Sequence, residues 1–156
     1  MQKTPLAIGL TVVALTFASM TAGAASAAQL IRYRGPTSQG ERVLLEVIKR
    51  ENGRRLLVTG LAGFTTTCED GFTDTFGRTF HRDTRLDDSG AFHIETGSRP
   101  GSIVGGRLVV DGVVGWGSAE GTLEFRYGSL DEVGDPQLCT TGTVDWQAER
   151  RRVSPI

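Results

Sequence analysis

The chain alternates apolar and polar residues over most of its length, with turn-forming residues between the alternating runs. A period of two residues is typical of a strand with one buried face. We expect strands at residues 30–34, 42–50, 55–67, 72–80, 91–96, 102–110, 113–116, 121–127 and 139–150. Nothing after residue 27 has the period of an amphipathic helix of about ten residues. The pattern predicts an all-β fold of about eight or nine strands, an antiparallel β-sandwich or a small β-barrel.

Short polar segments that contain glycine separate these runs and predict the turns. Asn52-Gly53 joins two strand-like runs, and this dipeptide is typical of a type I′ hairpin, which needs positive φ at both central residues. Asp111-Gly112 predicts a second tight turn, and residues 128–136 predict a polar, acidic loop.

The first 27 residues have the order of a secretory signal peptide. Lys3 precedes an apolar run at residues 6–17, and small residues end in Ala25-Ser26-Ala27. The apolar run is shorter than the roughly 20 residues that span a bilayer, although an uncleaved anchor is the alternative. We expect cleavage near residue 27, a secreted β domain over residues 28–149 with no membrane contact after cleavage, and a flexible basic tail at residues 150–156. The protein would then be extracellular or associated with the cell envelope.

Two cysteines, Cys68 and Cys139, lie in the expected mature chain. Export permits a disulfide, and two cysteines allow one intramolecular pairing. Two free thiols or a metal site are the alternatives, but His81 and His93 add no spacing typical of a metal site. We therefore expect a Cys68–Cys139 disulfide, no metal and no cofactor.

Charge and motifs narrow the function classes. The 156 residues carry 17 basic and 18 acidic side chains, a formal charge of −1, whereas a dedicated nucleic-acid binder needs a basic excess. The sequence has none of the zinc-protease, nucleophile-elbow or phosphate-loop motifs. We expect a single domain with no nucleic-acid partner and no catalytic residue.

The tryptophans and the strand-borne acids are the remaining candidates. Trp146 is in phase with Val144, which predicts core packing. Trp116 lies between two glycines, and exposure of its ring would make it a ligand-binding candidate. The acids on strand-like segments are Glu46, Glu95, Glu120, Glu124, Asp145 and Glu149. Two of them could form the carboxylate pair of a glycosidase.

Several short motifs together resemble a recurrent type of small secreted bacterial β domain. They are Tyr33-Arg34-Gly35, the middle Cys68, Gly90-Ala91-Phe92, Gly121-Thr122-Leu123 and the closing run C-T-T-G-T-V-D-W-Q-A at residues 139–148. The resemblance implies export, a cysteine pair and a β-sandwich. It implies no catalytic residue, because this type has no established activity.

We therefore expect an exported, non-enzymatic binding or interaction module whose partner is a glycan or a protein at the cell envelope. A small polysaccharide hydrolase with two strand-borne carboxylates is one alternative. Two acids within about 10 Å, one with a raised pKa, would favour it. An inhibitor-like protein that presents the loop Gly128 to Leu138 is the other, and an ordered projecting loop tied down near Cys139 would favour it.

Overall fold

The computed structural model describes residues 27–80, 83–97 and 106–156, and these contain ten strands and no helix. The strands are β1 (Gln29–Pro36), β2 (Arg42–Lys49), β3 (Arg55–Cys68), β4 (Thr73–Phe80), β5 (Thr84–Arg85), β6 (Ala91–Gly97), β7 (Arg107–Val114), β8 (Ser118–Leu130), β9 (Pro136–Thr140) and β10 (Val144–Pro155). Every strand pair is antiparallel, so the predicted all-β fold is confirmed. Apart from Ala27, the predicted signal peptide lies outside the described residues.

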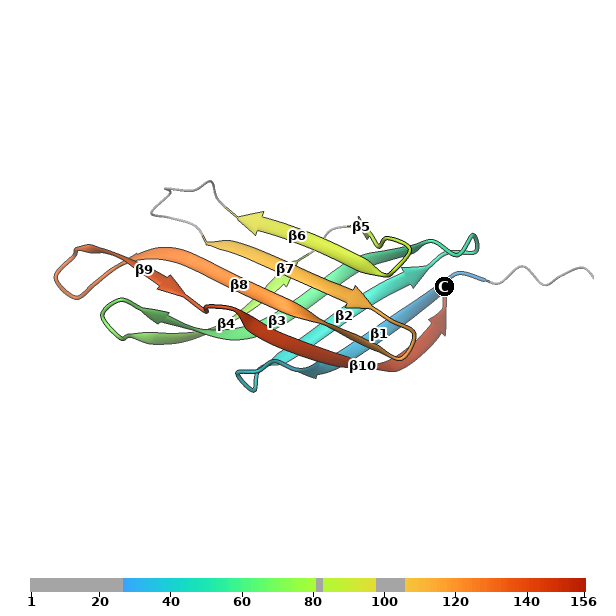
Figure 1. Cartoon of the computed structure of the whole chain (residues 1–156), viewed down its shortest axis with the longest axis horizontal. Coiled ribbons are helices and arrows are strands. Elements are labelled where there is room, and N and C mark those ends of the chain that lie inside the picture. Colours follow the sequence, from blue (N-terminus) through green and yellow to red (C-terminus); the bar gives the residue numbers. More distant parts are fainter. Residues whose placement is uncertain (1–26, 81–82, 98–105) are drawn as a thin grey trace, which may run out of the picture.

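The strands form two layers that share β10 (Figure 1). One layer has the order β10-β1-β2-β3, with β4 and β5 also paired to β3. The other has the order β6-β7-β8, and β9 and β10 both pair with β8. β10 pairs first with β8 and then with β1, so it crosses from one layer to the other. The layers are also joined by a short pairing of β3 with β9, so the fold is a β-sandwich connected by β10 and by β3–β9 rather than a regular barrel.

The core lies between the two layers because alternate residues of each long strand point inward. Its largest fully buried side chains are Trp146, Tyr33, Phe64, Phe80, Phe125, Ile31, Leu45, Leu57, Leu123, Val43, Val47 and Val110. Each such burial contributes about 1.5–3 kcal/mol before the loss of chain entropy. Trp146 is only 2% exposed and its ring centroid lies 6.3 Å from that of Phe92, which confirms the predicted core role.

The predicted disulfide is confirmed. Cys68 on β3 and Cys139 on β9 are directly opposite each other, and their sulfurs are bonded. The bond joins the two layers at one end of the sandwich, where β3 and β9 share only two residue pairs.

The turn at Asn52-Gly53 connects β2 and β3 as predicted, but the prediction of a type I′ turn was wrong. Gly53 has a φ of 79°, whereas no non-glycine residue in the described segments has a positive φ. A type I′ turn requires a positive φ at both central residues, Asn52 as well as Gly53. Instead the Asn52 side-chain oxygen accepts a hydrogen bond from the Arg54 amide at 3.1 Å, which stabilises a different turn.

The predicted turn at Asp111-Gly112 was also wrong, since both residues lie within β7. Gly112 is required there for packing rather than for turning. A Cβ at Gly112 would lie 2.6 Å from Cζ2 of Trp146, so the indole ring occupies the space of a side chain. The chain turns later, where the Gly115 amide donates to the Ser118 carbonyl at 2.8 Å.

Two further boundaries differ from the sequence prediction. The expected loop at 128–136 is shorter, because β8 extends to Leu130 and β9 begins at Pro136. The expected flexible tail at 150–156 was wrong, because β10 continues to Pro155 and pairs with β1. The reason is that β1 offers unpaired backbone groups at its edge, and the arginine side chains of the tail can still project outward.

Candidate functional site

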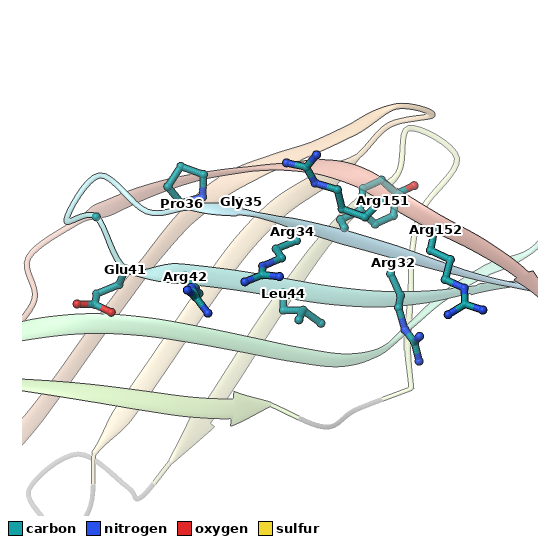
Figure 2. Close-up of a pocket in the computed structure, with 11 residues that line it drawn as sticks. Arg32, Arg34, Gly35, Pro36, Glu41, Arg42, Leu44, Arg151 and Arg152 are labelled. Carbon is teal, nitrogen blue, oxygen red and sulfur yellow. The ribbon is translucent and has the colours of Figure 1, made fainter.

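A hollow of about 590 Å³ lies on the outer face of β10, β1 and β2 (Figure 2). Alternation places Arg32 and Arg34 on this face because Ile31 and Tyr33 point into the core. The same phase on β2 turns Arg42 outward. We call this hollow the arginine groove, defined by Arg32, Arg34, Arg42, Arg151 and Arg152.

The C-terminal strand completes the groove through an irregular register. Arg32 is opposite Arg152, but the next residue, Tyr33, is opposite Arg150. Arg151 is therefore an extra residue in β10, and such a bulge re-aims side chains. As a result, the consecutive residues Arg151 and Arg152 both line the groove.

Positive charge dominates the groove. Its lining contains five arginines and a single acidic residue, Glu41. The Arg32 Nε atom lies 2.7 Å from an oxygen of Glu46, and an Arg151 nitrogen lies 3.3 Å from Glu149. The other three groove arginines form no salt bridge within the described parts of the chain.

The like charges also lie close together. Arg32 and Arg152 are directly opposite on neighbouring strands, an arrangement that destabilises a sheet. In Figure 2, Arg152 reaches from β10 beside Arg32, while Arg34 and Arg42 lie over β1 and β2. A bound anion would relieve this repulsion. Guanidinium groups suit that role because they bind carboxylate or phosphate through two parallel hydrogen bonds.

The spacing of the arginines favours a ligand with several anionic groups. Outward residues two positions apart on one strand lie about 7 Å apart, and adjacent strands lie about 5 Å apart. The groove spans three strands and contains the apolar side chains of Leu44 and Pro36 between the charges. The arrangement can therefore hold repeated anions and also contact a carbon skeleton.

Trp116, the sequence-predicted ligand-binding candidate, lies outside this groove. It is 63% exposed in the connection between β7 and β8. Lys49 Nζ lies 4.7 Å from its ring centroid, and Arg150 Cζ lies 6.0 Å from it. The ring thus has the exposure that ligand binding needs, but two cations already contact it.

Two of the strand-borne acids, Glu95 and Glu124, share one face of the sheet, but each is paired with an arginine. Glu95 and Glu124 both flank Val109 on the outer face of β6, β7 and β8. Arg107 donates to both oxygens of Glu95, at 2.9 and 3.1 Å, and these hydrogen bonds lower the pKa of Glu95. Glu124 is paired with Arg126. A glycosidase acid needs a raised pKa, so this pairing opposes the role.

The remaining polar candidates do not form a reactive cluster with these acids. His93 Nδ1 lies 2.7 Å from Asp111 Oδ1 across β6 and β7, with both side chains exposed. His81 lies outside the described residues. Within the described segments, no group of three or more His, Cys, Asp or Glu residues could hold a metal ion. The same segments contain no helix of the length and apolarity needed to cross a bilayer.

Sequence reasoning found the disulfide but missed the arginine groove. A signal was present, since Arg32, Arg34 and Arg42 share the polar phase of two strands, and residues 150–152 are consecutive arginines. Comparison of the chain with family models, with curated proteins and with solved structures finds no match. The resemblance drawn from short motifs therefore stays a prediction.

Proposed function

We propose that the protein is an exported, non-enzymatic binding module of the cell envelope that holds an anionic glycan in the arginine groove. The observation that carries this proposal is the excess of five arginines over one glutamate in a hollow on rigid strands. The leader-like first 27 residues and the Cys68–Cys139 disulfide support export, since disulfides persist in oxidising compartments.

A glycan fits this groove better than a compact anion does. The hollow is open to solvent along three strands, so it suits an extended chain, and Leu44 supplies an apolar contact between charged positions. The anionic groups would be carboxylates or phosphates, because both match the planar fork of arginine. The hydrolase alternative has less support, since Arg107 lowers the pKa of Glu95 and so favours its ionised form.

Binding of three polymers to the purified, oxidised protein tests the proposal. The polymers are a polyuronate for carboxylate, a teichoic acid for phosphate and dextran as the neutral control, each titrated by calorimetry over a salt series. We expect binding of at least one anionic polymer, no binding of dextran, and weaker binding as salt screens the charges. A random-sequence DNA duplex is a further competitor, and DNA binding as tight as glycan binding would contradict a glycan-specific groove.

Two matched variants locate the site. Arg34→Gln with Arg42→Gln removes two groove charges that have no carboxylate partner in the described structure. The control, Arg54→Gln with Arg85→Gln, removes two positive charges outside the groove, and both of these arginines are exposed. A charged hydrogen bond contributes about 1.5–3 kcal/mol, so each groove substitution should weaken binding about tenfold or more. Equal losses in both variants, or no binding of either anionic polymer, would refute the proposal.

A further inference from the structure

A second hollow, of about 820 Å³, lies at the end of the sandwich that carries the disulfide. The β3–β4 turn and the β8–β9 hairpin project there together (Figure 1). We call this end the disulfide tip, defined by residues 69–72 and 130–138. It shares no residue with the arginine groove.

Hydrogen bonds join the two turns of the tip into one unit. The Asp70 amide donates to the Gln137 side chain at 3.2 Å, and Gln137 Nε2 donates back to Asp70 Oδ2 at 3.0 Å. The Leu138 amide donates to a Glu69 oxygen at 3.1 Å. With the adjacent Cys68–Cys139 bond, these contacts hold the two turns in a fixed relation.

The hairpin itself is ordered by Asp131. Its Oδ1 atom accepts hydrogen bonds from the amides of Val133 and Asp135, at 3.0 and 2.8 Å. The Asp131 amide donates to the Asp135 carbonyl at 2.9 Å, which closes the turn. The loop is thus ordered and tied down near Cys139, as the loop-presenting alternative requires. Because the turn is closed, it presents side chains rather than an extended backbone.

The side chains that the tip presents are apolar. Phe72 is 59% exposed, Leu130 56% and Val133 82%, and all three line the hollow. Together with Leu138, they make up four of the nine large apolar side chains exposed in the described segments. Exposed apolar side chains gathered at one place are typical of an interaction surface.

All charged residues in the rim around these side chains are acidic. Glu69, Asp70, Asp131, Glu132 and Asp135 belong to or directly flank the hollow. Residues 67–76 and 127–141 contain no lysine or arginine. An anionic membrane surface would repel such a rim, whereas a basic partner would be attracted to it.

We infer that the disulfide tip is a docking surface for a protein partner that presents apolar side chains flanked by lysine or arginine. Charge complementarity supplies orientation, and burial of Phe72, Leu130 and Val133 supplies affinity. The rigid tip loses little conformational freedom on binding, which favours the complex.

Three labelled twelve-residue peptides test the inference by fluorescence anisotropy. The first alternates leucine with lysine, the second replaces each leucine by serine, and the third replaces each lysine by glutamate. We expect the first to bind the wild-type protein at least tenfold more tightly than the other two. Equal binding of the serine peptide would overturn the inference, because attraction by charge alone is not docking.

Variants then place the peptide on the tip. Val133→Ser should weaken binding of the leucine–lysine peptide about fivefold or more, and Glu132→Lys with Asp135→Lys should abolish it. Glu51→Lys with Asp88→Lys reverses the same charge in exposed turns elsewhere and should leave binding unchanged. Wild-type affinity in the Val133 and Glu132/Asp135 variants would overturn the inference. Val133 is a loop-apex residue at 82% exposure, so its substitution leaves the fold intact.

Two further measurements separate the competing outcomes. Sedimentation of the wild-type protein alone should show a monomer. Self-association that Val133→Ser abolishes would mean that a second copy occupies the tip, and would overturn the inference of a different partner. The Arg34→Gln, Arg42→Gln variant should bind the peptide as the wild type does, so failure of the glycan proposal and failure of this inference are distinguishable.

Discussion

Replacement of both Cys68 and Cys139 by alanine should lower the free energy of unfolding by about 4 kcal/mol. The two residues are 71 positions apart, so the bond closes a long loop in the unfolded chain. The chain-entropy relation gives a loss of about 15 cal/mol/K for such a loop, which is about 4.4 kcal/mol at 25 °C. Alanine is the appropriate replacement, since both cysteines are buried and serine would add a buried hydroxyl.

Urea unfolding followed by tryptophan fluorescence measures the effect, because Trp146 is buried and reports on the core. We expect the midpoint to fall and the slope to rise somewhat, because the unfolded chain without the bond is less compact, and wild-type protein in a reducing agent should behave like the double variant. The β3–β9 contact has only two residue pairs, so little else replaces the bond there. A difference below about 1 kcal/mol between the oxidised protein and the variant would refute the chain-entropy reasoning.

Two other substitutions test the packing. Tyr33 donates to the Gly115 carbonyl at 3.0 Å, so Tyr33→Phe should lose about 1 kcal/mol of stability. Burial raises the pKa of Tyr33, so the wild-type protein should lose stability as the pH rises above about 10. The Tyr33→Phe variant should lose less stability over the same range. Urea midpoints measured from about pH 8 to 11 test this difference. Gly121→Ala places a Cβ 2.0 Å from the Asp111 carbonyl oxygen and 2.6 Å from Trp146, and should lose about 3 kcal/mol or more in the same assay. Gly117→Ala, with no atom within 4 Å of its Cβ, is the control, and equal stability of the two glycine variants would contradict the packing.

Much of the strand content was predictable because the inward and outward phase is a local property. The buried face of β1 includes Ile31 and Tyr33, and that of β2 includes Val43 and Leu45. In each strand the two apolar residues are two positions apart, and this spacing is visible in the sequence itself. The Asp111-Gly112 dipeptide shows where local reasoning fails. The same two residues suit a tight turn or a strand crossed by a large ring, and only the distant Trp146 decides between them.

The site was less predictable because it depends on pairing between the two ends of the chain. Arg32 and Arg152 are 120 positions apart, yet the register of β1 and β10 places them opposite each other. Three consecutive arginines are typical of a solvated terminus, so the sequence alone favoured a tail. The open edge of β1 overrides that preference, and the charges become the wall of a groove.

The near-zero net charge of the chain conceals how the charges are distributed over the fold. The groove face of β10, β1 and β2 is basic, while the outer face of the other layer carries Glu95, Asp111, Glu124 and Asp145, with Arg107 and Arg126 offsetting two of these charges. A polyanion approaching this molecule is attracted by one face and repelled by the other, so the field orients it toward the groove. The whole-chain balance of 17 basic and 18 acidic residues therefore argues against unspecific binding of polyanions, but it does not argue against binding at one face. The distinction depends on strand phase and register, which convert a neutral composition into separate basic and acidic surfaces.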